Sequence, residues 1–314
     1  MRISVTDRCN LRCRYCMPEP IDALGHGEIL RYEEILRICS AASELGIRKF
    51  KVTGGEPLVR ADCVSFIAAL KRQSGTEQVT LTTNGLLLGK NLDALAAAGL
   101  DGINISLDSL NAERYTRISG HPEGAELLKR IMQAVEEASA MGLRTKLNAV
   151  LLEETEEDAP ELASIAEELP VDVRFIELMP IGFGTGMRRV SPDDILSALR
   201  ERWPDLAPTD ERRGNGPAHY YKSDLLLGRI GFIDAVSHKF CADCNRVRLT
   251  STGQLKPCLC YADSADLRTL IRGGCTDDEL REALKISIYN KPRAHCFDTG
   301  TAVTERHAMS QIGG

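Results

Sequence analysis

Long apolar runs, an excess of positive charge and low-complexity tracts are all missing from this 314-residue chain. No stretch is apolar for long enough to suggest a membrane span, and no leading apolar segment looks like a secretory signal peptide. The formal net charge of -6 argues against a broad nucleic-acid-binding surface, although local basic pockets for phosphates are compatible with it. These absences leave a globular protein, and a hydrophobic content of 43% is enough for a substantial core.

Cysteine, in contrast, is abundant, with 11 in the chain. In a small secreted protein that number would indicate disulfides, but the length and the lack of a signal segment favour a reducing cytoplasm. Six cysteines form two spaced groups of three, one in each half of the chain. The others are scattered, and scattered thiols are most often ordinary core or surface residues; they are Cys39, Cys63, Cys260, Cys275 and Cys296.

The first group is Cys9, Cys13 and Cys16, with the spacing C-x3-C-x2-C. Three thiolates on a [4Fe-4S] cube leave the fourth iron open to a substrate or cofactor. Zinc is the competing interpretation, but structural zinc sites usually pair two Cys-x2-Cys knuckles and catalytic ones usually include histidine. No histidine lies within the stretch, so the spacing favours a cluster.

The second group is Cys241, Cys244 and Cys258, with the spacing C-x2-C-x13-C. These thiols suit zinc and a cluster equally well, because either His238 or Cys260 is available as a fourth zinc ligand. Cys260 lies two residues after Cys258, so on an extended strand both side chains would leave the same face. The spacing alone leaves these alternatives open.

Arg246 and Arg248 follow the second group and also share one face of an extended strand. Two guanidinium groups beside a metal site could hold a triphosphate or the edge of a purine. Two solvated surface arginines are the ordinary alternative for an isolated Arg-x-Arg.

Short β-branched runs alternate with helical periodicity over most of the chain. The predicted strands cover residues 2–6, 49–53, 79–82, 102–107, 144–151 and 171–178. The predicted helices cover residues 31–45, 61–72, 92–98, 123–141, 161–168 and 191–202. This alternation predicts a parallel sheet with right-handed crossovers, closed or partly closed as a barrel. Polar residues and glycines gather at the strand ends, as the mouth of such a barrel requires.

The pattern changes after the last of these helices. Residues 204–217 are rich in proline, glycine and charge, which is typical of a boundary. Strand-like pieces follow at 225–233 and 247–250, then helical segments at 265–271 and 277–284. We therefore predict an α/β protein with a partial, six-stranded TIM-like βα barrel over residues 1–203. A C-terminal α+β extension carrying the second cysteine group would cover residues 204–314.

The first cysteine group, with Tyr15 before its third thiol, resembles the signature of the radical S-adenosylmethionine (SAM) superfamily. A wider set of motifs resembles the GTP 3′,8-cyclase family, radical SAM lyases that open molybdenum-cofactor biosynthesis. These motifs are Thr6-Asp7-Arg8 and Met17-Pro18, the turns Gly54-Gly55-Glu56-Pro57 and Thr83-Asn84-Gly85, the run 245–250, and Gly313-Gly314. The resemblance spans nearly the whole chain, and the second cysteine group with Asn-Arg-x-Arg-Leu-Thr is its most specific part.

The resemblance implies two [4Fe-4S] clusters and SAM as cofactors. The SAM cluster would be held by Cys9, Cys13 and Cys16, and an auxiliary cluster that meets the guanine of GTP by Cys241, Cys244 and Cys258. The implied SAM contacts are Tyr15, Gly55, Glu56, Ser106 and Met179. The implied GTP contacts are Arg2, Lys51, Thr82, Lys146, Arg246, Val247 and Arg248. The tail residues that the resemblance places in the active site are Gly313 and Gly314.

The implied reaction begins when a 5′-deoxyadenosyl radical takes H3′ from GTP. Attack of C3′ on C8 then gives (8S)-3′,8-cyclo-7,8-dihydroguanosine 5′-triphosphate. The resemblance also implies an electron donor such as flavodoxin or ferredoxin, a homodimer, a cytoplasmic location, and transfer of the product to cyclic pyranopterin monophosphate synthase. Neither nucleic acid nor a membrane is an expected partner.

Two rival functions fit parts of the sequence. A radical SAM peptide-modifying enzyme also combines an N-terminal trio with an auxiliary cluster, but its auxiliary domain usually has seven or more clustered cysteines. A non-enzymatic zinc or iron–sulfur scaffold would leave the cationic residues at the strand ends without a purpose. One departure from the cyclase pattern concerns substrate binding, because Lys51 stands where the family commonly has arginine.

Overall fold

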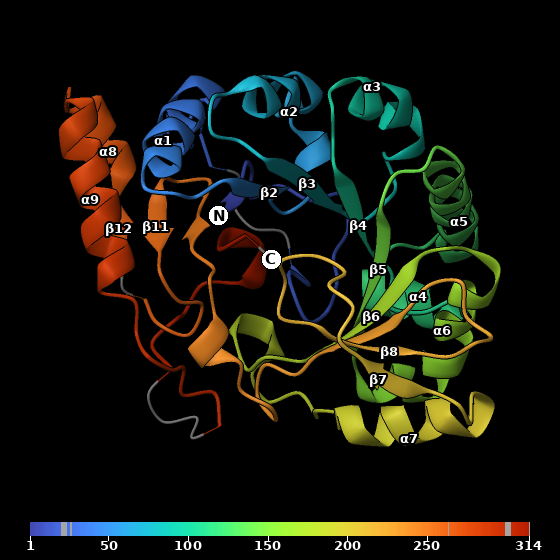
Figure 1. The fold of residues 1–314 in the computed structure, drawn as a ribbon. Coiled ribbons are helices and arrows are strands. Elements are labelled where there is room, and N and C mark those ends of the chain that lie inside the picture. Colours follow the sequence, from blue (N-terminus) through green and yellow to red (C-terminus); the bar gives the residue numbers. More distant parts are fainter. Residues whose placement is uncertain (20–23, 26, 263, 299–302, 314) are drawn as a thin grey trace.

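The computed structural model describes residues 1–19, 24–25, 27–262, 264–298 and 303–313. At its centre six parallel strands pair in sequence order (Figure 1). They are β1 (Arg2–Ser4), β2 (Lys49–Thr53), β3 (Gln78–Thr83), β4 (Gly102–Ser106), β5 (Thr145–Leu151) and β6 (Asp172–Glu177). The six predicted strands are confirmed, with ends that shift by one or two residues.

Helices cover the outer, convex side of this sheet (Figure 1). They are α1 (Tyr32–Glu44), α2 (Cys63–Arg72), α3 (Leu92–Ala97), α4 (Ala112–Ser119), α5 (Gly124–Ala140) and α6 (Ala159–Glu168). All of them except α4 were expected from periodicity. Helix α1 is followed by Gly46, whose φ of 90° other residues rarely adopt, so the chain leaves the helix there.

The alternation of side chains along β5 separates the core from the inside of the curve. Leu147 and Ala149 are buried, whereas Lys146 and Asn148 are half-buried and line cavities on the inner side. Burial of each large aliphatic side chain contributes about 1.5–3 kcal/mol. The outer face of the sheet therefore builds the core against the helices, and the inner face remains available for polar side chains.

Residues beyond the six-stranded core lengthen the sheet at both edges. The later elements are α7 (Pro192–Arg202), β7 (Ala207–Thr209), β8 (His219–Lys222), β9 (Ile230–Ile233), β10 (Arg248–Leu249), β11 (Gln254–Lys256), β12 (Ala265–Asp266), α8 (Leu267–Arg272) and α9 (Asp277–Tyr289). Among the described residues the strand order is β12-β11-β10-β1-β2-β3-β4-β5-β6-β9-β8-β7. Because β12 and β7 are the two ends of this order, the barrel is partial, as predicted.

Short 3-10 helices occur in the connections. They are η1 (Pro57–Val59), η2 (Gly89–Asn91), η3 (Glu153–Asp158), η4 (Gly182–Gly184), η5 (Cys241–Asp243) and η6 (Met309–Gln311). The stretch around η6, near the C-terminus, coils inside the curve of the sheet (Figure 1). The predicted division between residues 203 and 204 stays a prediction. Within the described residues, none of the helices combines the length and the apolar character that crossing a membrane requires.

Candidate active site

The first cysteine group lies on a loop that follows β1 and is fixed to the end of α4. The backbone N–H groups of Arg12 and Arg14 donate to the carbonyls of Ser119 and Ile118, at 2.8 and 3.0 Å. Gly120, at a φ of 66°, makes this approach possible, because a Cβ there would lie 2.7 Å from the carbonyl oxygen of Arg12. Helix α4, which the sequence did not predict, therefore positions the loop that carries the thiols.

The glycine turn after β2 holds the same loop from the other side. A Cβ on Gly55 would lie 2.4 Å from the carbonyl oxygen of Arg8. The N–H groups of Gly55 and Glu56 donate to the carbonyls of Thr6 and Arg8, both at 2.8 Å. The paired glycines thus allow close backbone packing against the cysteine loop.

Tyr15 joins the cysteine loop to the end of β4. Its hydroxyl donates to Asp108 at 2.9 Å, and the other carboxylate oxygen of Asp108 accepts from the N–H of Val150 at 2.8 Å. Burial raises the pKa of Asp108 to about 6, while these two hydrogen bonds oppose that rise. Tyr15, Ser106 and Asp108 therefore line one continuous wall of the cavity described next.

All six thiols of the two groups line one cavity of about 320 Å³. Tyr15, Gly55, Ser106 and Met179 line the same cavity, as does Arg248. The two groups are more than two hundred residues apart in the chain, yet β10 pairs with β1 and brings them to one space. The two cysteine groups therefore face one common cavity.

The donor set fits iron–sulfur clusters. Within the described residues no three His, Cys, Asp or Glu side chains are close enough together to hold a single metal ion. A cube takes one thiolate on each iron, so its ligands stand farther apart than those of tetrahedral zinc. Burial raises the pKa of the Cys9 and Cys13 thiols and raises that of Cys16 to about 12. Because burial disfavours the charged thiolate form, these thiols become good ligands only when a bound cationic centre compensates the thiolate charge.

The second group has a different electrostatic environment. Burial alone raises the pKa of Cys244, but a backbone hydrogen bond, the charge of Arg246 and that of Lys291 outweigh it and lower the pKa. The Arg246 guanidinium donates to the Cys244 sulfur at 3.4 Å and stacks 4.8 Å above the ring of Phe240. Arg246 is therefore fixed between the second cysteine group and a second, neighbouring cavity, which is described next.

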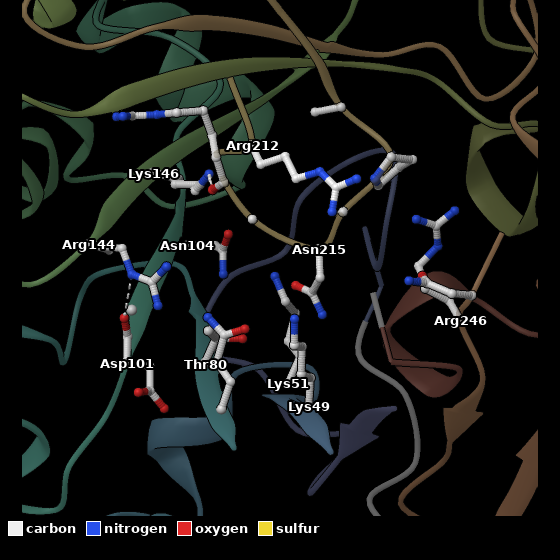
Figure 2. Close-up of a pocket in the computed structure, with 18 of the residues that line it drawn as sticks. Lys49, Lys51, Thr80, Asp101, Asn104, Arg144, Lys146, Arg212, Asn215 and Arg246 are labelled. Carbon is white, nitrogen blue, oxygen red and sulfur yellow. Dashed lines mark hydrogen bonds between the residues drawn. The ribbon is translucent and has the colours of Figure 1, made fainter. Parts of the chain in front are cut away.

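That neighbouring cavity has a volume of about 800 Å³ and is rich in cations. Figure 2 shows Lys51, Lys146, Arg212 and Arg246 around it. Lys51 and Lys146 come from strands β2 and β5, Arg212 from the β7–β8 loop, and Arg246 from the loop before β10. Arg2, Thr82 and Arg246 line both cavities. The two cavities therefore meet at these residues, with the thiols on one side and the cations on the other.

Lys51 is the cation with the most unusual surroundings. Its side chain makes no hydrogen bond or ion pair within the described part of the chain. Burial, followed by the positive charges of Arg174 and Arg2, lowers its pKa well below the ordinary 10.5. An anionic ligand would remove this penalty, because opposite charge favours the protonated ammonium.

Lys146 already has partners. Its ammonium lies 2.9 Å from a carboxylate oxygen of Asp172 and donates to the hydroxyl of Tyr220 at 2.9 Å. It also donates to the backbone carbonyl of Arg213, in the loop between β7 and β8. Lys146 thus lines the cavity and also connects β5 to that loop.

Three predicted site residues differ from the rest in their placement. Glu56 is fully buried and lines neither cavity; its carboxylate accepts hydrogen bonds from Thr83 and from the backbone of Asn84. In the structure Glu56 fixes the turn after β3, and its role as a SAM contact stays a prediction. Val247 packs in the core, and Gly314 lies outside the described residues. The carbonyl of Gly313 accepts from Arg248 at 3.1 Å.

The sequence did not single out two polar residues of the inner sheet face. Arg174, on β6, donates to the side-chain oxygens of Asn148 and Asn104. Both Arg174 and Asn104 are buried and line the cationic cavity. The available signal was an arginine between Val173 and Phe175 in an otherwise apolar run, because a buried charge needs a partner.

Two family models match successive parts of the chain. Residues 3–166 match the Radical SAM superfamily, and residues 171–297 match Molybdenum Cofactor Synthesis C. The chain belongs to the radical SAM superfamily, as its first cysteine group and its partial barrel indicate.

The similarity to curated proteins is closer. The chain is 39% identical to GTP 3′,8-cyclase of Clostridium perfringens (strain 13 / Type A) over 316 residues, which cover 100% of this chain and 97% of the relative. It is 42% identical to the GTP 3′,8-cyclase of Heliobacterium modesticaldum over 321 residues, with the same coverage. For Paracoccus denitrificans the identity is 41%, covering 99% of this chain and 90% of the relative. The chain belongs to the GTP 3′,8-cyclase family.

Among solved structures, Streptococcus suis SuiB bound to S-adenosylmethionine resembles this chain with a TM-score of 0.64. The alignment covers 99% of this chain and 76% of SuiB at 13% identity. At that identity the likeness shows the fold alone. It confirms the predicted partial barrel with a C-terminal extension.

Proposed function

We propose that this chain is a GTP 3′,8-cyclase that works with two [4Fe-4S] clusters and SAM. The observation that supports this most strongly is the shared cavity: both cysteine groups line one space, which meets a cationic cavity at Arg2, Thr82 and Arg246. A nucleoside triphosphate matches this arrangement, because its phosphates suit the cations and its base can reach toward the thiol-lined side.

The positions of the thiols in one cavity support the proposed ligand sets. Cys9, Cys13 and Cys16 would hold the cluster that binds SAM, and the second cluster would be held by Cys241, Cys244 and Cys258. When bound, the reduced cluster and SAM supply the hydrogen-atom abstraction with which the reaction starts. The overall reaction joins C3′ of the ribose to C8 of guanine within one GTP molecule.

The protein's own contribution is orientation. Lys51, Lys146 and Arg246 bind the triphosphate through charge-assisted hydrogen bonds, which are strong in a secluded site. Arg248, held by the carbonyl of Gly313, lines the wall beside the second cysteine group. A fixed orientation matters here because a reactive carbon-centred species takes the nearest hydrogen, so misplacement of the ribose would misdirect the reaction.

The remaining partners are supported by the resemblance to the family. They are a single-electron donor such as flavodoxin or ferredoxin, a second copy of the chain in a homodimer, and cyclic pyranopterin monophosphate synthase as the consumer of the product. A reducing, cytoplasmic location is supported by the family resemblance and by the length of the chain, which is unlike that of a small disulfide-linked secreted protein.

The test is an anaerobic assay of the reconstituted protein. We expect about eight iron atoms per chain, as two cubes require. Incubation of the reduced protein with SAM and GTP is expected to give 5′-deoxyadenosine and a cyclised nucleotide together. Cleavage of SAM that is indifferent to GTP, or two zinc ions with no SAM turnover, would contradict the proposal and favour a peptide-modifying enzyme or a scaffold.

A further inference from the structure

The last described residues of the chain are attached to the body by a buried ion pair. The Lys256 ammonium lies 2.5 Å from a carboxylate oxygen of Glu305, and their side chains are 4% and 0% exposed. Lys256 also donates to the backbone carbonyl of Tyr261 at 2.7 Å. Two charges this far from water persist only with close partners, so the position of Glu305 is sharply defined.

Glu305 in turn organises the chain around it. Its second carboxylate oxygen accepts from the N–H groups of Arg306 and His307, at 2.9 and 2.8 Å. Its own N–H donates to the carbonyl of Cys260 at 3.3 Å. One residue earlier, the hydroxyl of Thr304 accepts from the N–H of Ala262 at 2.9 Å. Residues 304–307 are thus docked on the segment that contains the predicted cluster ligand Cys258.

The other end of the same tail is held by the strand next to Lys256. Arg248 on β10 is the register partner of Lys256 on β11. The guanidinium of Arg248 donates to the carbonyl of Gly313, and Met309 between the two attachment points lines the thiol cavity. Two neighbouring cations therefore hold the tail at residues 305 and 313.

We propose that the Lys256–Glu305 ion pair is a positioning latch that sets where the C-terminal tail enters the active site. Neither residue lines the thiol cavity or the cationic cavity, so neither is expected to touch the substrate or the cofactors. Their effect is exerted through Gly313 and Arg248. The inference rests on the proposed function, because the tail matters for the reaction only if the thiol cavity is the active site.

The test compares Glu305→Gln and Lys256→Met in the reconstituted holoenzyme with a chain that lacks residues 313–314. Each latch variant is expected to lower the rate of cyclised-nucleotide formation by about 10²-fold, the scale of a misplaced catalytic element. We expect iron content and KM for SAM to stay at wild-type values, while more 5′-deoxyadenosine is released per cyclised nucleotide. Lys256→Arg keeps the charge and is expected to retain most of the rate.

A double-variant cycle separates positioning from general stabilisation. Glu305→Gln combined with removal of residues 313–314 is expected to be no slower than the deletion alone, because both changes disable one unit. If the two rate losses multiply in the double variant, the latch proposal is wrong. A Glu305→Gln rate equal to the wild-type rate would also overturn it. Matched surface controls are Glu282→Gln and Lys285→Met, an exposed ion pair on α9, and neither is expected to change the rate.

Two further measurements test the latch if a charge variant folds poorly or if the protein has no cyclase activity. Thr304→Val removes the hydroxyl that accepts from Ala262 without burying an unpaired charge, and it is expected to lower the rate in the same direction by a smaller factor. Trypsin cleavage after exposed Arg306 is expected to be faster in the latch variants than in the wild type. Unchanged cleavage would contradict the latch. A wild type without GTP-dependent SAM cleavage would instead contradict the proposed function.

Discussion

Arg2 and Arg248 are register partners on the adjacent parallel strands β1 and β10, and Lys51 is the partner of Arg2 on the other side. Three cationic side chains therefore stand in a row across the sheet. Like charges directly opposite each other destabilise a sheet, and burial followed by the charge of Arg246 lowers the pKa of Arg248 to about 10. An anion bound beside this row would favour the charged form of these side chains.

Lys51→Met tests this conflict between binding and stability. We expect KM for GTP to rise at least tenfold, since hydrogen bonds to charged groups are worth about 1.5–3 kcal/mol. The thermal midpoint of the protein without GTP is expected to increase, because a repelled, half-buried charge is removed. Lys90→Met, an exposed lysine on η2, is the control and should change neither quantity. An unchanged KM with a lower midpoint would assign Lys51 to structure instead.

The lowered pKa of Lys51 also predicts a pH dependence of GTP binding. The ammonium is charged below its folded-state pKa and neutral above it, so KM for GTP is expected to rise as the pH increases through that pKa, below the ordinary 10.5. Lys51→Arg carries a guanidinium that stays protonated, so the variant should lose this part of the pH profile. The measurement is the ratio of the two KM values against pH, because titration of GTP itself affects both proteins equally. A constant ratio would contradict the assignment.

Gly55→Ala tests how the first cysteine group is held. The added Cβ would lie 2.4 Å from the carbonyl oxygen of Arg8, which real Cβ atoms do not tolerate, so the cysteine loop must move. We expect the reconstituted variant to bind about four iron atoms, the content of one cube, in place of about eight. Gly27→Ala is the matched control, because no atom lies within 4 Å of its added Cβ. Full iron content in Gly55→Ala would show that the turn does not position the thiols.

Cys260→Ala tests the alternative fourth ligand of the second group. In the structure the sulfur of Cys260 lies 3.1 Å from that of Cys296, and Cys260 does not line the cavity. Iron content is therefore expected to stay at about eight, whereas Cys258→Ala should reduce it to about four. Loss of iron in both variants would make Cys260 a ligand.

The six-stranded core was predictable because its signals are local. Period-two alternation in β5 and the helical spacing of α1 follow from residues close together in the sequence. The edge strands β7, β8, β11 and β12 were missed, since strands of two to four residues are defined by pairing with distant partners. Helix α4 was missed because its sequence carries few apolar residues and is stabilised by contacts with α5.

The site residues were predictable where a recognisable sequence motif indicates their chemistry. The cysteine spacing and the Arg-x-Arg pair led to residues that line the two cavities. Arg174 and Asn104 carry no motif, and only strand register places Asn104 beside Lys146 and Arg174 beside Asn148. The same holds for Glu56, whose partner Thr83 is set by the packing of η1 against β3. Sequence alone indicates which residues are special, but not which special residue faces the ligand and which supports it.

In the proposed enzyme the two adjoining cavities bring the ribose of GTP to bound SAM. The most direct measurement uses GTP deuterated at C3′ and follows the label during anaerobic turnover. We expect deuterium to appear in 5′-deoxyadenosine while the nucleotide product loses it. Unlabelled 5′-deoxyadenosine formed together with a cyclised product would contradict the account.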